Sequence, residues 1–176
     1  AADRSYIIRY EWDTYTTTMT HEWCGIGVEP SFEMEQGLSM AAAPQQQQRL
    51  VALDVNQIDD VTQLGPDWEE DRRYLDDEGI TAILEVPFAI DGRLSGVIGF
   101  DAVNGPVQWR SSDVTALKAV ASLLANVLAR TVAEGARDET VRELRAVFGD
   151  APVPLMLLDP GADAAVGDHL RIAFGQ

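Results

Sequence analysis

The sequence predicts an α+β domain, in which an antiparallel sheet is flanked by helices and followed by a long C-terminal helix. Two apolar, β-branched runs, 81–90 and 93–103, are joined by Asp91-Gly92. Asp-Gly between such runs is typical of a two-residue hairpin, because a type I′ turn needs positive φ at both central residues. Residues 4–12 alternate between apolar and polar side chains, as a strand with one buried face does. Beyond the hairpin, apolar residues recur at spacings of three and four, which predicts the long helix.

The composition describes an acidic, foldable chain. Its 176 residues are 46% hydrophobic and 24% charged, which suits one domain with a sizeable core, or one domain and a fragment. The net charge of −16 repels phosphate backbones and anionic membrane surfaces, so we expect neither nucleic acid nor membrane as a partner. We find no run of about 18 apolar residues, which predicts that no helix spans a membrane.

Two further features bear on the compartment and on the limits of the chain. Cys24 is the only cysteine, which excludes a disulfide within the chain and fits a reducing, cytoplasmic compartment. The chain enters its first predicted strand almost at once and shows no signal peptide. We therefore expect it to be a segment of a longer protein.

The first half of the chain predicts short strands and two helices. In chain order we expect a strand at 4–12, a loop or strand start at 13–20, a second strand at 21–28 that is broken by glycines, an irregular or shortly helical segment at 29–40, a short helix after Pro44, a strand at 50–55, and an acidic helix within 59–78 that ends at Gly79. Pro at a helix start and Gly at a helix end fit the conformations that these residues favour.

The second half predicts the hairpin, the long helix and a short tail. Pro87 cannot donate to a strand ladder, so we expect a bulge beside it. Ser111-Ser112-Asp113 suits a helix start, with a Ser oxygen as the cap. Gly135 predicts an interruption before a second helix at 138–148. The tail then predicts strands near 155–158 and 170–174.

The hairpin text resembles a known family. Residues 86–94 (VPFAIDGRL) and 96–100 (GVIGF) are similar to the most recognisable segment of GAF domains. Residues 20–24 (THEWC) with 27–30 (GVEP) resemble a subgroup found in bacterial multidomain signalling proteins. The resemblance covers roughly residues 3–134 and implies a central antiparallel sheet of about five or six strands flanked by helices.

The tail has a resemblance of its own. Residues 144–148 (LRAVF) and 150–159 (DAPVPLMLLD) are similar to the opening of a PAS domain, of which only the first helix and two strands are present. We therefore predict a GAF-like sensory domain at 1–134, a linker or signalling helix at 135–148, and an N-terminal fragment of a PAS-like domain at 149–176.

The resemblance also implies a ligand pocket between one face of the sheet and the helices and loops that cover it. By analogy its lining comes from Trp68, Tyr74, Phe88, Ile98, Trp23 and Met40. The alternative is that these side chains simply fill the core. Trp68 and Tyr74 could orient a ligand through their polar ends. The ligand and any cofactor stay unidentified.

Other chemistries find little support in the residues. His21, Glu22 and Cys24 are metal-competent, but on a strand His21 and Cys24 point to opposite faces, so we predict no metal site. Cys24 lacks a partner motif for nucleophilic catalysis or for bilin attachment. The Asn-Lys-Phe-Asp-Glu signature of cyclic-nucleotide-binding GAF domains is absent. We interpret Gly96 and Gly99 as points where a backbone or a ligand approaches the sheet closely.

The long helix also predicts self-association. Its apolar residues follow the alternation of three and four that suits a seam between helices, and they resume after Gly135. We predict a parallel homodimer through Leu117, Val120, Leu124, Val127, Val141, Leu144 and Phe148.

The leading functional hypothesis is a non-catalytic module that senses a small molecule, dimerises and regulates an output domain of a bacterial signal-transduction protein. By family analogy the output is a diguanylate cyclase or phosphodiesterase of cyclic di-GMP signalling, a histidine kinase of a two-component system, or a phosphatase. One alternative is an enzyme of GAF-like fold, such as a reductase of free methionine sulfoxide, which normally needs a second cysteine. Another alternative is a structural dimer module without a ligand.

Overall fold

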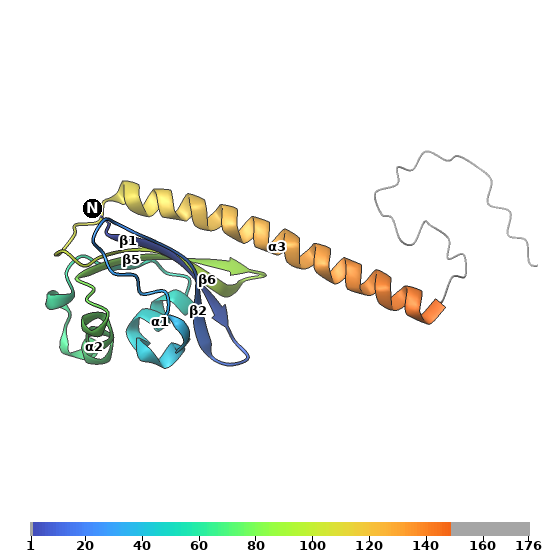
Figure 1. The fold of residues 1–176 in the computed structure, drawn as a ribbon, viewed down its shortest axis with the longest axis horizontal. Coiled ribbons are helices and arrows are strands. Elements are labelled where there is room, and N and C mark those ends of the chain that lie inside the picture. The colour runs from blue at the N-terminus through green and yellow to red at the C-terminus, as the bar shows by residue number, and fades with distance from the viewer. Residues whose placement is uncertain (1, 149–176) are drawn as a thin grey trace, which may run out of the picture. The chain divides into compact units, whose positions relative to one another are not determined.

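The computed structural model describes the backbone of residues 2–148 and the side chains of residues 2–134 and Glu139. The described chain contains a six-stranded antiparallel sheet with the order β3-β2-β1-β6-β5-β4. α1 and α2 cover one face, and the first part of α3 lies along the other (Figure 1). The elements are β1 (Arg4–Glu11), β2 (Thr16–Cys24), β3 (Gln36–Ser39), α1 (Pro44–Val51), β4 (Asn56–Ile58), α2 (Glu69–Asp77), β5 (Ala82–Ile90), β6 (Arg93–Ala102) and α3 (Ser111–Phe148). Three short 3-10 helices, at Met40–Ala42, Val61–Gln63 and Pro66–Trp68, lie between them.

The hairpin forms as the sequence predicts. Asp91 and Gly92 adopt φ values of 51° and 76°, and Ile90 pairs with Arg93 across the turn. The register between β5 and β6 shifts after Phe88, so the predicted bulge lies directly beside Pro87. Gly79 lies just after the C-terminus of α2 and has φ 68°, the left-handed conformation that glycine adopts freely.

Each face of the sheet buries its own apolar cluster, because successive strand residues point to opposite sides. The face toward α3 buries Ala82, Leu84, Val86, Phe88, Ala102, Trp109, Leu117 and Ala121. The opposite face buries Tyr6, Ile8, Tyr10, Met19, Leu50, Leu94 and Val97 beneath α1. A third cluster, below α2, contains Ile58, Val61, Leu75, Ile80 and Ile83.

Two glycines of β6 allow this packing, although the groups that approach them are mainly aromatic side chains and not the backbone or ligand that the sequence interpretation expected. A Cβ atom at Gly96 would lie 2.3 Å from Cζ of Phe88 and 2.5 Å from the carbonyl oxygen of Ile8. A Cβ atom at Gly99 would lie 2.5 Å from Cζ of Tyr6. The absence of side chains at these positions leaves space for an aromatic side chain of a neighbouring strand, Phe88 on one face and Tyr6 on the other.

The predictions for the first half were wrong at three places. The strand predicted at 21–28 is β2, which begins at Thr16 and ends at Cys24. The run 50–55 is not a strand: Leu50 and Val51 finish α1, Leu53 has φ 62°, and the strand begins only at Asn56. Pro44 at the start of the helix and the burial of Leu50 place these apolar residues on a helical face. Residues 36–39 form the edge strand β3, which lacks the apolar alternation that signals a strand.

α3 begins at Ser111, as predicted, but its cap differs. The carboxylate of Asp113 accepts from the backbone N–H of Arg110 at 2.9 Å and pairs with the Arg110 guanidinium, so no Ser oxygen provides this cap. The helix continues through Gly135, where an interruption was predicted, because one helical glycine costs only about 1 kcal/mol. The predicted strands at 155–158 and 170–174 lie outside the described residues.

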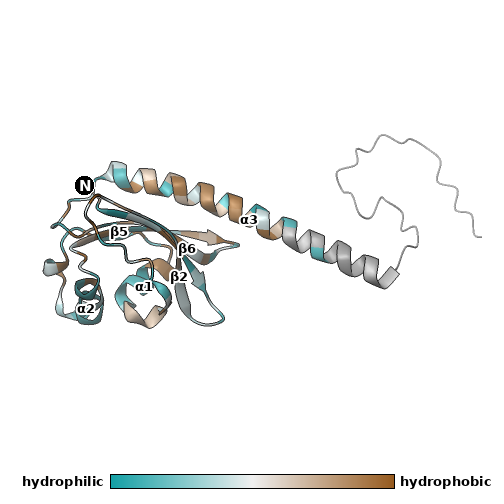
Figure 2. Cartoon of the chain, viewed as in Figure 1, coloured by the Kyte–Doolittle hydropathy of each residue, from teal (hydrophilic) through white to brown (hydrophobic). Residues whose placement is uncertain are grey.

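One described helical segment, Ser111–Glu134, is long and apolar enough to cross a membrane by length and composition alone. The sequence interpretation predicted no such helix. Figure 2 shows the hydrophobic residues that run along this part of α3. Leu117 and Ala121 of the same segment are buried against the sheet, so part of its apolar surface serves the packing of the domain.

Candidate ligand-binding site

A small cavity lies between the face of the sheet opposite α3 and the segments that cover it. Strands β1, β2, β5 and β6 supply its floor, while β3, α1 and α2 supply its cover. Its volume is about 40 Å³. One water needs about 10–15 Å³ by this measure, so the cavity has room for about three waters or a similarly small group. Its polar lining residues are Tyr6, Tyr10, Thr17, Ser31, Glu35, Ser39, Gln46, Gln47, Tyr74, Glu85 and Asp101.

Glu85 is the centre of a buried polar network at this cavity. It lies among apolar residues in the middle of β5, where it pairs with Gly99 and faces the cavity. Its carboxylate accepts from the hydroxyl of Tyr6 at 3.2 Å and from Nδ2 of Asn56 at 2.9 Å. Burial raises the pKa of Glu85 to about 7, although both hydrogen bonds act in the opposite direction. This carboxyl therefore changes its protonation near neutral pH.

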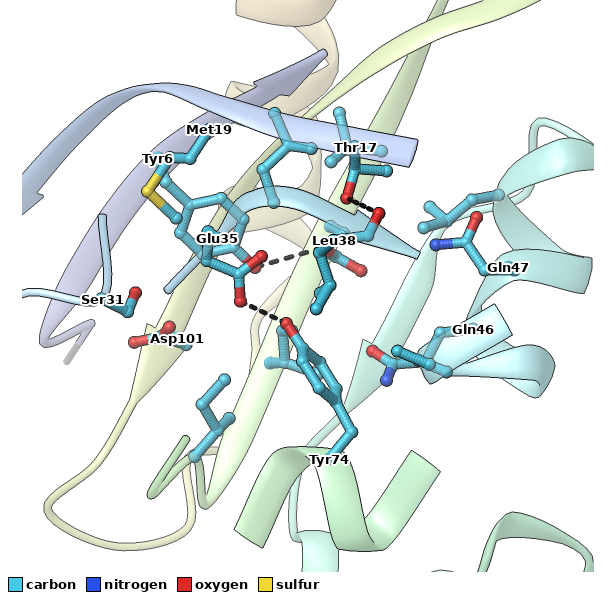
Figure 3. Close-up of a pocket in the computed structure, with 18 of the residues that line it drawn as sticks. Tyr6, Thr17, Met19, Ser31, Glu35, Leu38, Gln46, Gln47, Tyr74 and Asp101 are labelled. Carbon is cyan, nitrogen blue, oxygen red and sulfur yellow. Dashed lines mark hydrogen bonds between the residues drawn. The ribbon is translucent and has the colours of Figure 1, made fainter. Parts of the chain in front are cut away.

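Glu35 provides a second buried carboxyl on the covering side. The hydroxyl of Tyr74, from α2, donates to Glu35, which precedes β3 (Figure 3). Burial raises the pKa of Glu35, and the hydrogen bond from Tyr74 opposes part of that rise. Nearby, the hydroxyl of Thr17 donates to the carbonyl of Leu38 at 3.4 Å, which ties β3 to β2. The contact between Glu35 and Tyr74 thus joins two covering elements over the cavity.

Asp101 is the third buried carboxyl, and it alone has a cationic partner within the site. Nε of Arg4 donates to its two oxygens at 2.9 and 3.1 Å, and both side chains are buried. Arg4 also donates to the carbonyl of Glu78 at 3.2 Å, at the end of α2. Burial raises the pKa of Asp101, while the Arg4 hydrogen bond opposes that rise. The pair connects β1 to β6 beside the cavity.

α1 receives its N-terminal cap from α2 rather than from its own sequence. Ala43 at the cap position has no suitable side chain, and the backbone N–H groups of Gln45 and Gln46 donate to the buried carboxylate of Asp71 at 3.1 and 2.9 Å. A carboxylate at this position also suits the positive end of the helix. Asp71 thereby fixes the start of α1, which carries Gln46 and Gln47 to the cavity.

The predicted pocket residues are only partly brought together. Tyr74 lines the cavity. Phe88 and Ile98 lie on the other face of the sheet, with α3. Side chains alternate between the two faces along a strand, and both residues are an odd number of positions from Glu85 and Asp101, respectively.

The other three predicted pocket residues lie apart from the cavity. Trp68 packs near Leu75 and beneath the guanidinium of Arg49, which is 4.4 Å from its ring centre. Met40 packs on the cluster beneath α1, and Trp23 is 62% exposed. We therefore reassign the site to the cavity lining.

The sequence interpretation missed Tyr6, Glu35, Gln46, Glu85 and Asp101. One usable signal was present: Glu85 is the only charged residue of the run AILEVPFAI over 82–90. A carboxyl in the centre of a buried strand is rare unless it has a partner or a function. For Glu35 and Gln46 no comparable signal exists, since both lie in polar stretches.

The residues considered for metal or cysteine chemistry have other surroundings. Glu22 accepts from the backbone and hydroxyl of Ser31 and from the backbone of Phe32, so it anchors the loop before β3. His21 is exposed. Burial raises the pKa of the Cys24 thiol, which disfavours the reactive thiolate. Within residues 2–134, no group of three or more His, Cys, Asp or Glu side chains is arranged to hold a metal ion.

The predicted dimer residues divide between two sides of α3. Leu117 is 2% exposed and belongs to the core, and Leu124 packs against the same cluster. Val120 and Val127 are exposed, together with Leu123, which the prediction did not include. The remaining predicted residues, Val141, Leu144 and Phe148, lie outside the described side chains.

Comparison with known proteins agrees with this architecture. The family model of the GAF domain matches residues 1–128, and the chain therefore belongs to the GAF family. No curated protein matches the chain in sequence.

Solved structures of similar fold include sensor domains. One is the blue-light-absorbing form of the PixJ GAF domain from Thermosynechococcus elongatus, with 22% identity, a TM-score of 0.66, and coverage of 82% of this chain and 83% of that chain. A phycocyanobilin-bound GAF domain from a cyanobacterial phytochrome has 18% identity, a TM-score of 0.62, and coverage of 76% and 78%. A domain assigned to a two-component sensor histidine kinase protein from Sinorhizobium meliloti 1021 has 20% identity, a TM-score of 0.58, and coverage of 78% and 86%. At these identities the likeness concerns the fold.

Proposed function

We propose that this GAF domain is a non-catalytic module that senses a small molecule and dimerises through α3, and that it regulates an output domain of a signal-transduction protein. The observation that carries the proposal is the cavity, whose wall holds buried hydrogen-bonding groups from the sheet and from its cover. Buried polar groups of this kind are costly unless they are paired. Most of these groups pair with one another, whereas Nε2 of Gln46 has no partner, so a ligand that accepts from it would stabilise the arrangement of β3, α1 and α2 around the cavity.

The size of the cavity limits what is sensed. A similar fold in the cyanobacterial phytochrome holds phycocyanobilin. The cavity of about 40 Å³ in this chain has no room for a tetrapyrrole without a large displacement of its cover. We therefore propose a ligand much smaller than a bilin, held without a covalent bond. Its binding would favour one arrangement of the cover and so shift the population seen by the output domain.

Native mass spectrometry of the protein purified from cells tests the sensing proposal. We expect a non-covalent adduct of small mass that disappears when the protein is denatured. A thermal-shift screen of small metabolites provides the second readout, since a ligand that binds only the folded state raises the midpoint of unfolding. A bare protein mass together with no stabilising compound would support the alternative of a ligand-free structural module.

The dimerisation proposal rests on the second apolar side of α3. Leu117 and Ala121 use one side of the helix to pack on the sheet. Val120, Leu123 and Val127 then follow at spacings of three and four on a separate side, and Leu123 and Val127 are 65% and 62% exposed. An exposed apolar stripe at this spacing is suited to a parallel helix pair, which would bury it against the same stripe of a second copy.

We predict that the double substitution Leu123→Glu/Val127→Glu converts a dimer into a monomer, because it places like charges where two stripes would meet. Sedimentation velocity at micromolar concentration measures the change. The matched control is Thr115→Glu/Ser122→Glu, which adds the same charge at exposed positions about a third of a turn around the helix. We expect the control to remain dimeric. A wild-type protein that sediments as a monomer would contradict this part of the proposal and leave the sensing part unaffected.

A further inference from the structure

Two of the three buried carboxyls of the cavity accept hydrogen bonds from neutral groups alone. Glu35, Glu85 and Asp101 all line the cavity and all are buried. Asp101 is paired with Arg4, whereas Glu85 accepts only from neutral groups of Tyr6 and Asn56. The hydrogen bond that Glu35 receives also comes from a neutral group, the hydroxyl of Tyr74. Among the described residues that line the cavity, none has a basic side chain. Glu35 and Glu85 are therefore buried at the cavity without a basic lining side chain to pair with.

A separate observation concerns a buried donor at the cavity that has no acceptor. Gln46 is 3% exposed and lines the cavity, and its side-chain amide projects from α1 into it (Figure 3). Oε1 of Gln46 accepts from Nδ2 of Asn56 at 2.8 Å, which fixes the orientation of the amide. Nε2 of Gln46 then has no hydrogen-bond partner, although it is fully buried. Leaving such a donor unpaired costs about 1–3 kcal/mol, which an acceptor inside the cavity would recover.

We propose that the cavity binds a small organic cation whose protonated nitrogen donates to Glu35 and Glu85 and whose oxygen accepts from Gln46. This inference rests on the proposed sensing function and names the chemical class of the ligand. The volume sets its size: space for about three waters accommodates a head group of about four non-hydrogen atoms. An ammonium group two carbons from a hydroxyl has this size and both required functions.

The charge of Glu85 couples this binding to a proton. Its pKa is about 7, so below that pH most of the free protein carries the proton on Glu85. A cation favours the carboxylate, and the proton must then leave to solvent. Hydrogen bonds from Asn56 and Tyr6 lower the pKa of Glu85. The neighbouring acidic side chains Glu35 and Asp101 raise it.

Isothermal titration calorimetry with ethanolamine tests the class of ligand. The matched probes are ethylene glycol, which replaces the ammonium group by a hydroxyl, propylamine, which lacks the oxygen, and glycolate, which reverses the charge. We expect saturable binding of ethanolamine, weaker binding of propylamine, and none of the other two. At pH 6, titrations in buffers of different ionisation enthalpy should show a proton released on binding of ethanolamine.

Substitutions then place the binding in the cavity. Glu85→Gln should weaken ethanolamine binding by about tenfold or more, because a charged hydrogen bond is lost, and should remove most of the proton release. Glu35→Gln is a second variant that should weaken binding without removing the proton release. The control Glu69→Gln changes an exposed carboxyl of α2 outside the cavity and should bind as the wild type does.

The outcomes separate this inference from the proposed function. No binding of ethanolamine, equal binding of ethylene glycol or glycolate, or binding unchanged in both cavity variants would overturn the assignment of a cation. If native mass spectrometry nevertheless detects a neutral or anionic ligand, sensing stands and only the ligand class is wrong. If no probe binds and no adduct is found, the proposed function fails as well.

Discussion

Arg4→Met should lower the free energy of unfolding by about 3–5 kcal/mol, because it leaves Asp101 buried without its cation. The lost guanidinium also removes the donor to the carbonyl of Glu78, which ties β1 to the end of α2. Methionine approximates the length of the apolar stem of arginine, so the change removes mainly charge and hydrogen bonds. Urea denaturation followed by circular dichroism at pH 7 measures the loss.

Two controls define what the loss means. Arg9→Met breaks the exposed pair with Glu11 on the same strand and should cost less than about 1 kcal/mol. Arg4→Met/Asp101→Leu removes both buried charges and should recover much of the stability, since an apolar pair often replaces a buried ion pair without loss. If Arg4→Met and Arg9→Met cost the same, the buried pair would contribute no more than a surface pair.

The fold was predictable because its strongest signals are local. Asp91-Gly92 between two apolar runs determines the hairpin, and Pro44 and Gly79 mark helix limits that the structure retains. Where the local pattern was weak, prediction failed. β3 carries Gln36 and Gly37 and forms a strand only because the edge of β2 is available to pair with it.

The site was less predictable than the fold, because neighbouring residues of a strand face opposite sides of the sheet. Phe88 and Glu85 lie three residues apart on β5, so they face opposite sides of the sheet. Both sides of β5 are apolar, and the sequence pattern does not distinguish the side beneath α3 from the side beneath α1. The apolar side chains at Phe88 and Ile98 were attractive candidates, whereas the cavity is defined by the carboxyls on the other side.

The covering side of the site depends on contacts between segments far apart in the chain. Asp71 caps a helix that begins 27 positions earlier, and Tyr74 contacts Glu35 across 39 positions. No periodicity within α1 or α2 encodes such pairs. Only the assembled fold places Gln46 with an unpaired amide donor at the cavity wall.

Glu85→Gln should reduce the pH dependence of stability more than any other single substitution at the site. Folding raises the pKa of Glu85 from 4.5 to about 7, so between these values the folded state retains a proton that the unfolded state releases. The folded state then binds more protons, and stability falls as the pH rises through this window. From pH 5 to pH 8 the wild type should lose about 2–3 kcal/mol through this group.

Urea denaturation of both proteins at pH 5 and pH 8 measures this effect. The variant should lose about 2–3 kcal/mol less than the wild type over that interval, because glutamine stays neutral throughout. Glu35 and Asp101, whose pKa values are also raised, act in the same direction, so a smaller slope should remain in the variant. Glu69→Gln on the surface of α2 should retain the wild-type slope.

The pH dependence of stability in the presence of ethanolamine provides a second test. A cation that binds the carboxylate lowers the pKa of Glu85 in the complex, so saturating ligand should flatten the wild-type slope and leave that of Glu85→Gln almost unchanged. A slope equally steep in wild type and variant would mean that Glu85 is already ionised in the folded state at pH 5. In that case the network with Tyr6 and Asn56 would hold the negative charge without help from a ligand.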